Sequence, residues 1–565
     1  MRPSPPERAH AAKPLVTRLT RQLVALGGAL AVAAGFAAVQ APPASAANST
    51  TYLGNVGRGG DVAAGGGKVF VAADNRIIVA DAQGALTGAI TGLSGAVGLA
   101  MTPDGTRLYA ALSDSNQVAE IDTAALTVTR RIDLTAYPCP SSLALSGSSL
   151  FVGHGCGKSW DGGALSLDLS ATSPEPVRIT ANLNQAPLVT AAGNTLVVGE
   201  TGISPADLFV YDGTASPATL RGVINSSSSY LRDLAITPDG SMVVSAFEAP
   251  YIFDAWDTTS LTKARTYGTG PTIEGHPVAV AISSDGAHVA GALGPARFAQ
   301  TGPDVALYDA ETTTKTNSND NPIGEVAPGG LAFAGTDLFV VLKEGYNGPR
   351  HLWRLHGALL PASTLTLTAP SQGTALEPLT LTGQLTLSSG APPGAQPLIV
   401  TRRHPDGTSA KLEDVGTAVD GTFSVTDAPT VGGTIRYDVL WDGDSNFRWN
   451  AASVTVSVTK RQASLTMSGP ATGVAGKQLQ FNGALDVDGK PVPAGTVFTV
   501  TRTVSGRDGT VTTTLPSVAP AGDGSFSFTD TPAEGGQHTY TVRLSDDTFL
   551  PAQASHEITV RGGQG

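Results

Sequence analysis

The stretch TPDGTRLYAALSDSNQVAEIDTAALTVTRRIDL, residues Thr102 to Leu134, alternates short apolar runs with turn residues. It reads as strand, turn, strand, turn, strand. The Pro-Asp-Gly triplet is typical of a tight turn, because proline presets φ, aspartate caps the turn and glycine accepts positive φ. So small a sheet cannot bury both of its faces alone, and the fold therefore depends on whether the chain repeats this unit.

The strand RLYAAL of this stretch belongs to a series of seven similar strands spaced 39 to 49 residues apart. The other six are KVFVAA at Lys68, SLFVGH at Ser149, TLVVGE at Thr195, MVVSAF at Met242, HVAGAL at His288 and DLFVVL at Asp337. Units of four short strands with a period of roughly 40–45 residues predict an all-β chain that begins with a seven-bladed β-propeller. We expect the strand STTYLGNV, from Ser49, to complete the last unit and close the ring.

A second recurring feature is an aspartate that ends a later strand of most units. The set is Asp81, Asp122, Asp168, Asp212, Asp257 and Asp309. One interpretation is a ring of carboxylates that binds a cation. We favour the other, a turn residue that closes the outer hairpin of each unit, because the turn itself recurs.

The Pro-Asp-Gly turn, the apolar strand after it and the ID ending with its threonine-rich tail resemble the YVTN-type (YncE-like) bacterial β-propeller repeats. The resemblance covers about Ser49 to Gly357. It implies the architecture and leaves the activity open, since this family includes surface proteins, binding proteins and a few enzymes.

Beyond LLPAS (Leu359 to Ser363) the period changes to about 103 residues, as the match between DGTFSVTDAPTVGG and DGSFSFTDTPAEGG shows. We predict two tandem β-sandwiches, residues 362–459 and 460–562, from the alternation of SVTVSV and TYTVRL. Tyr437 with LWDGDSNF, and Tyr540 with LSDDTF, resemble bacterial Ig-like repeats. The second copy departs from that family's Gly-Asp-x-x-Tyr signature.

The leader of the chain contains five basic residues, Arg2, Arg8, Lys13, Arg18 and Arg21, and is followed by the uncharged run Leu23 to Val39 and by Ala44-Ser45-Ala46. This pattern predicts a secretory signal peptide over residues 1–46, which leaves the propeller residues 47–358. A membrane anchor is the alternative, but the run is shorter than the ~20 residues that a spanning helix needs. We expect a chain that is secreted and extracellular, or held at the cell surface noncovalently, with no membrane span after cleavage.

The chain carries a net charge of −12, and removal of the leader leaves 30 Lys+Arg against 46 Asp+Glu, a net charge of −16. Such a surface repels phosphate backbones, so nucleic acid is not an expected partner. The expected partner is instead a protein or glycan of the cell envelope or the extracellular medium, and the chain is expected to be a monomer.

Cys139 and Cys156 are the only cysteines. They bracket two short expected strands, and in an exported chain an even number of cysteines favours a disulfide. Two buried free thiols are the alternative. A metal site is disfavoured, because two sulfurs with no nearby histidine pair cannot complete a tetrahedral shell.

No motif for catalysis or cofactor binding occurs, so we assign no catalytic residue, no cofactor and no metal ligand. The stretches Asn317 to Asn321 and Asp442 to Asn446 resemble calcium loops and are interpreted as solvated turns. His154, Asp161 and His276 would be the candidates for a site at the channel mouth, and exposed loop residues are the favoured interpretation.

Two functions stay open. The first is a non-catalytic binding or scaffold protein, with a ligand-binding propeller face and Ig-like repeats that act as spacer or envelope contact. The second is a lactonase- or lyase-like propeller enzyme with a site at the channel mouth. A purely structural extracellular role is a minor third.

Overall fold

The computed structural model describes residues 48–249, 251–268, 275–294, 303–321, 323–345, 348–506 and 509–562. Every regular element within these ranges is a β-strand. The predicted signal peptide, 1–46, lies outside the described residues. Among the residues that are described, there is no helix with the length and apolar character needed to cross a bilayer.

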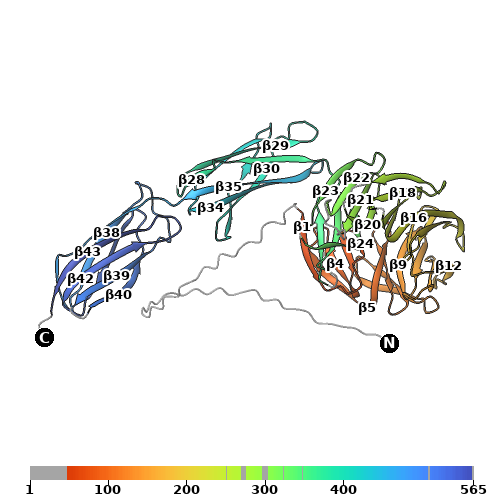
Figure 1. Cartoon of the computed structure of the whole chain (residues 1–565), viewed down its shortest axis with the longest axis horizontal. Coiled ribbons are helices and arrows are strands. Elements are labelled where there is room, and N and C mark those ends of the chain that lie inside the picture. The colour runs from red at the N-terminus through yellow and green to blue at the C-terminus, as the bar shows by residue number, and fades with distance from the viewer. Residues whose placement is uncertain are drawn as a thin grey trace, which may run out of the picture. The chain divides into compact units, whose positions relative to one another are not determined.

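The first part of the chain, which we call the ring, forms five sheets that surround a common centre (Figure 1). One sheet holds seven strands in sequence order: β2 (Val62–Gly65), β3 (Lys68–Ala72), β4 (Asp74–Asp81), β5 (Leu86–Met101), β6 (Arg107–Leu112), β7 (Gln117–Asp122) and β8 (Thr127–Asp133). The next holds β9 (Pro140–Ser146), β10 (Ser149–His154), β11 (Gly162–Asp168) and β12 (Val177–Leu183).

The third sheet again has seven strands: β13 (Leu188–Ala192), β14 (Thr195–Gly199), β15 (Ala206–Asp212), β16 (Thr219–Ile236), β17 (Met242–Ala249), β18 (Phe253–Asp257) and β19 (Lys263–Tyr267). The fourth holds β20 (His276–Ile282), β21 (His288–Gly294), β22 (Val305–Asp309) and β23 (Lys315–Asn319). The fifth holds β24 (Glu325–Ala334), β25 (Asp337–Lys343), β26 (Arg350–Leu355) and, at its edge, β1 (Ser49–Gly54).

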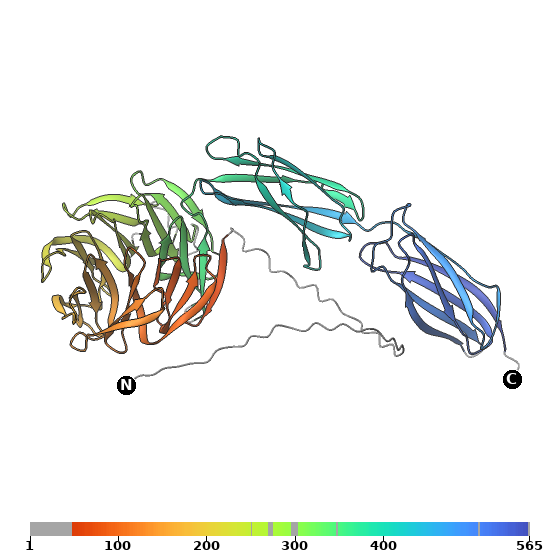
Figure 2. The ribbon, with the colours of Figure 1, turned by 180° about the vertical axis from the view of Figure 1, so that it is seen from behind.

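The ring closes between its first and last strands. β1 pairs antiparallel with β26, with Ser49 opposite Arg354 and Tyr52 opposite His351. This is the pairing that the sequence predicts for STTYLGNV. The innermost strands also meet in a closed circle, since β2 contacts both β5 and β24, and the circle continues through β9, β13, β16 and β20. Figure 2 shows the same circle of sheets from behind.

Apolar side chains packed between neighbouring sheets hold the ring together. Val69 and Val71 of β3 pack with Phe339 and Val341 of β25. Further clusters of this kind join each sheet to the next around the circle. Such burial, at roughly 25 cal/mol per Å² of apolar surface, stabilises sheets that are each too small to be stable alone.

The Pro-Asp-Gly turns are built as their residue types predict. Asp104 Oδ1 accepts hydrogen bonds from the backbone N–H and the hydroxyl of Thr106, and Gly105 has φ +69°. Asp239 caps its turn in the same way. These turns therefore form from local contacts alone.

Beyond the ring, two units each contain two sheets, drawn in teal to light blue and in dark blue (Figure 1). In the first C-terminal unit, one sheet holds β27 (Ser363–Thr368), β29 (Leu379–Leu387) and β33 (Thr422–Asp427). The other holds β28 (Gln372–Thr374), β35 (Arg448–Thr459), β34 (Gly433–Gly443), β30 (Pro397–Arg403), β31 (Ser409–Lys411) and β32 (Val415–Gly416). Its core joins both sheets through Leu381, Phe423, Tyr437 and Trp441.

The second C-terminal unit repeats this arrangement. One sheet holds β36 (Ser464–Ser468), β38 (Leu479–Asp486) and β41 (Ser525–Asp530). The other holds β37 (Thr472–Val474), β43 (Ala552–Arg561), β42 (Gly536–Leu544), β39 (Phe498–Gly506) and β40 (Gly509–Val518). Phe498, Phe526 and Val542 lie in its core.

Candidate functional site

The centre of the ring contains a cavity of about 580 Å³. Its wall is built from the innermost strands of every sheet of the ring, so chain segments far apart in sequence meet there. Among the lining residues are Asp61, Leu99, Ser142, Val189, Asp233, Val280 and Leu331. We therefore take this cavity as the candidate site, because concave pockets with a few convergent polar groups are the usual place for ligands.

Two aspartates in this wall tie neighbouring innermost strands together. Asp61 Oδ2 accepts the backbone N–H of Leu99 at 2.7 Å, and Asp233 Oδ2 accepts that of Val280 at 2.8 Å. Their Oδ1 atoms accept the N–H of the next residue in each chain segment. Ser142, within β9, makes a similar link to the next innermost strand, since its hydroxyl oxygen accepts the N–H of Val189 at 3.0 Å.

The joint between β5 and β9 has a glycine, Gly98 of β5, instead of a polar side chain. A Cβ atom on Gly98 would lie 1.9 Å from the carbonyl oxygen of Ser141. The strands therefore approach too closely at Gly98 for any side chain there.

The environment of the two aspartates favours their protonated forms. Burial raises the pKa of Asp61 to about 7, against the effect of its two backbone hydrogen bonds. Burial likewise raises the pKa of Asp233 to about 7, and the charge of Asp61 adds to that shift. The cavity wall consequently holds two carboxyl groups that exchange protons near neutral pH.

Three arginines also line the cavity, and two of them are neutralised. Arg58 forms ion pairs with Asp74 and Asp114, and Arg232 pairs with Glu248 at 2.5 Å.

The third arginine, Arg350, donates from Nη1 to the carbonyl of Gly348 at 2.9 Å. Its Nε is buried and has no partner among the described residues, and burial lowers the pKa of its guanidinium. Among the three arginines of this wall, Arg350 is the one for which no carboxylate partner is seen among the described residues.

The residues that the sequence suggested for a channel-mouth site do not line this cavity. His154 is 8% exposed, and its ring packs edge-on against Tyr137. Burial lowers its pKa, although the charge of Asp161 opposes that shift. Asp161 itself accepts the backbone N–H groups of Cys156 and Lys158, so it caps its own loop.

His276 bonds through Nδ1 with the carbonyl of Glu248, and its ring packs against Tyr251. His351 makes a similar ring contact with Tyr52, and its Nε2 lies 2.7 Å from Oε1 of Glu344. These histidines therefore have structural partners in the ring.

The recurring strand-end aspartates act as turn residues. Asp122 Oδ1 accepts the backbone N–H groups of Ala124 and Ala125, and Asp257 does the same with Thr259 and Ser260. The other members, Asp81, Asp168, Asp212 and Asp309, also accept N–H groups two to four residues later. The turn interpretation is therefore the one that the hydrogen bonds support.

Residues of the two calcium-like stretches make hydrogen bonds within the protein, local in the second stretch and long-range in the first. Asp444 accepts the N–H groups of Asn446 and Phe447, which makes this stretch a capped turn. Asn317 donates to the carbonyl of Ala358 at 3.1 Å. Within the described ranges, no group of three or more His, Cys, Asp or Glu side chains is arranged to hold a metal ion.

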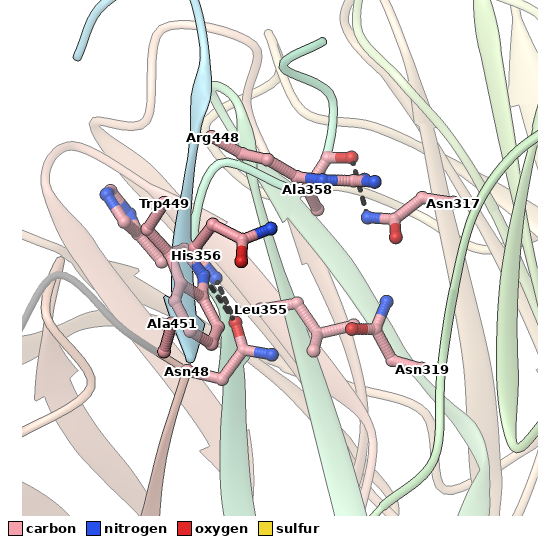
Figure 3. A pocket seen from close by; sticks show the side chains of 10 residues that line it. Asn48, Asn317, Asn319, Leu355, His356, Ala358, Arg448, Trp449 and Ala451 are labelled. Atoms are coloured by element: carbon pink, nitrogen blue, oxygen red, sulfur yellow. Dashed lines mark hydrogen bonds between the residues drawn. The ribbon is translucent and has the colours of Figure 1, made fainter. Parts of the chain in front are cut away.

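Asn317 and Asn319 also line a smaller cavity of about 310 Å³, shown in Figure 3. In this view Asn48 lies beneath His356 and Trp449, and its Oδ1 accepts the backbone N–H of the former and the indole N–H of the latter. The side-chain oxygen of Asn48 is thus used to hold the segment before β1 against His356 and Trp449.

Cys139 and Cys156 form a disulfide, with their Cα atoms 5.1 Å apart. The bond joins the segment before β9 to the segment after β10, and the two strands pair with each other. It fastens the loop that carries Asp161 to the ring.

No protein-family model matches the chain, and no curated protein matches it. Among solved structures it resembles the hydrazine synthase of Kuenenia stuttgartiensis, at 17% identity over 52% of this chain and 93% of that one, with a TM-score of 0.42. It also resembles the β-propeller domain of Cps50 (Swd1) from Myceliophteria thermophila, at 12% identity over 54% and 99% of the two chains, with a TM-score of 0.42. Hsv2 of Kluyveromyces lactis matches at 11% identity over 55% and 93%, with a TM-score of 0.37.

Proposed function

We propose that residues 47–358 form a seven-bladed propeller of the YVTN type. Support comes from the strand order, because each of the two seven-stranded sheets divides into two four-stranded blades if its long strand, β5 or β16, is shared. The other three sheets supply one blade each. We assign the two C-terminal units, 362–459 and 460–562, to the Ig-like repeats, on the basis of their paired sheets and shared cores.

We infer that the chain is a non-catalytic binding or scaffold protein that is secreted, or held noncovalently at the cell surface. The propeller presents the ligand-binding face, and the Ig-like units act as spacer or envelope contact. The observation that carries this proposal is the central cavity. Asp61 and Asp233 use their carboxylate oxygens to hold strands, while the Nε of Arg350 has no hydrogen-bond partner within the described residues.

The test is a ligand screen of the chain from Ala47 to Gly565 by thermal shift, against envelope glycans, soluble peptides and divalent cations with and without chelator. Arg350→Gln should abolish the shift that an acidic ligand produces. Arg232→Gln, whose partner is Glu248, is the matched control and should retain most of it. Binding that both variants retain would contradict a site in this cavity.

The alternative is a propeller enzyme of the lactonase or lyase type. One observation favours it: two carboxyl groups with a pKa of about 7 share one cavity, and such groups suit general acid–base catalysis. Lactone hydrolysis by the chain at pH 7, lowered about 100-fold or more by Asp233→Asn, would support this alternative.

A further inference from the structure

The second C-terminal unit contains a cavity of about 430 Å³ beside strands β39, β40 and β42, the dark blue strands of Figure 1. Arg502, Thr510, Thr513, Glu534 and His538 provide the polar part of its wall. Val504 and Val511 provide an apolar part. The cavity lies far along the chain from the central cavity of the ring and belongs to one unit only.

His538 is the most unusual group in this wall. It is 1% exposed, and neither ring nitrogen meets strict hydrogen-bond geometry with a described residue, although the backbone of Glu534 lies close enough to act on the ring as a weak hydrogen-bond partner. Burial and then the charge of Arg502 lower its pKa, against the weaker opposing effects of that backbone contact and of the charges of Asp530 and Glu534. The ring is therefore neutral at pH 7, with one nitrogen that donates and one that accepts.

Arg502 supplies a second unused donor. Its Nη1 is paired with Asp530 at 2.6 Å, but its Nε is buried without a partner in the described part of the chain. A buried donor without a partner lowers the free energy of unfolding, and so do the nitrogens of His538. Both residues therefore destabilise the folded unit.

The first C-terminal unit shows that the fold does not require a polar atom without a partner at either position. There, Arg402 Nε bonds to Nε2 of His404, where the second unit has Val504. The place of His538 in the repeat is taken by Ile435, which is fully buried in the core. The second unit therefore differs at two neighbouring places, and both changes leave polar atoms unsatisfied beside the same cavity.

The charges and donors of the cavity indicate one class of ligand. Arg502 is neutralised by Asp530, and Glu534 adds a negative charge, so an anion is disfavoured. His538 and Glu534 alone are too few ligands for a metal ion, which takes three or four protein groups. A neutral hydroxyl both donates and accepts, which matches a neutral imidazole beside a guanidinium N–H and two threonine hydroxyls.

We propose that this cavity is a carbohydrate subsite, in which His538 and Arg502 Nε bind the hydroxyl groups of one sugar residue while Val504 and Val511 contact its apolar face. This inference rests on the envelope-contact role proposed above for the C-terminal units. It adds the place and the chemistry of that contact.

The test uses the full chain from Ala47 and tetrasaccharides of glucose, mannose or N-acetylglucosamine as probes, observed by saturation-transfer NMR and calorimetry. We expect one of them to bind, and His538→Ile to weaken that binding about tenfold or more, since two hydrogen bonds are lost. His404→Val, in the first unit, is the matched control and should bind as the unchanged chain does. Thermal unfolding of each variant verifies that it is folded.

The proposal is overturned if no tetrasaccharide binds, or if His538→Ile binds as well as the unchanged chain. It is also overturned if inorganic phosphate or Zn²⁺, rather than a sugar, binds in a manner that His538→Ile abolishes. Sugar binding that is lost in Arg350→Gln but retained in His538→Ile would leave the proposed function of the ring intact and refute only this subsite.

Discussion

The two C-terminal units share one buried hydrogen-bond network and differ beside it. In the first, Arg402 Nη1 contacts both oxygens of Asp427, at 2.8 and 3.0 Å, and Tyr437 donates to Asp427 Oδ2 at 2.7 Å. In the second, Arg502 and Tyr540 contact Asp530 Oδ2 at 2.6 and 2.8 Å. The arginine–aspartate–tyrosine triad is therefore common to both units and joins the same three strands of each fold.

The difference lies in the partners around the triad. The first unit completes it with His404 and fills the next core position with Ile435, whereas the second replaces these residues with Val504 and His538. One copy thus satisfies its polar atoms internally, and the other leaves buried polar atoms beside a cavity without partners of good geometry among the described residues. The residues that the two copies share stabilise the fold. A ligand-binding site is therefore better sought at the positions where the two copies differ.

The largest expected effect comes from breaking what the two units share. Asp427→Asn and Asp530→Asn would each leave a mostly buried guanidinium without its counter-charge. We expect each to destabilise its own unit by about 3–5 kcal/mol. Calorimetric unfolding measures the loss, and hydrogen exchange locates it. A change below about 1 kcal/mol in both would show that the triad does not hold these units together.

The next largest effect on stability is expected when the core residues His538 and Ile435 are exchanged between the two units. His538→Ile should stabilise the second unit by about 1–3 kcal/mol, because it removes two unmet buried polar atoms. Ile435→His should destabilise the first by about 2–5 kcal/mol, since it puts such atoms into a filled core. Chemical denaturation of the paired variants measures both, and equal signs would refute the comparison.

A smaller effect is expected at the arginine Nε. Val504→His should give Arg502 the partner that Arg402 already has, which contributes about 0.5–1.5 kcal/mol. His404→Val should cost the first unit a similar amount. The unfolding midpoints of the two units report both changes, and a Val504→His variant less stable than the unchanged chain would contradict the proposed equivalence.

The smallest effect is a dependence on pH that only the second unit should show. Because its environment lowers the pKa of His538 below the ordinary 6.5, the unfolded chain binds a proton that the folded unit does not. The stability of the second unit should therefore fall as the pH drops through 6.5, until the folded histidine also titrates. Thermal unfolding between pH 7.5 and 5 measures this slope, and His538→Ile should remove it.

Much of the fold could be predicted because its signals are local. The turn that Asp104 caps depends on contacts within five residues, and the strand-end aspartates depend on contacts within four, so the residue types alone indicate them. The pairing of β1 with β26 could be predicted from a count of strands, because the last unit lacked one.

The candidate sites could not be predicted in the same way. Asp61 and Asp233 each precede an apolar strand and a turn, and that signal is visible in DVAAGGG and DLAITPDG. Their joint place in one cavity depends on ring closure, which brings distant strands together. The exchange of Ile435 for His538 is visible when the two repeats are aligned, but its burial and the unmet partners of Arg502 appear only when the strands are packed.

The ring can close only after nearly all of its chain has been synthesised, because its closing strand is made first and the partner of that strand last. Asn48, beside β1, meets His356 across a separation of 308 residues. At roughly 5–20 residues per second, the segment around Asn48 waits about 15–60 s for its partner to emerge. During that interval β1 presents a free edge to every other nascent strand. Its first three residues, Ser49, Thr50 and Thr51, are polar, a composition that limits premature pairing while the rest of the ring is made.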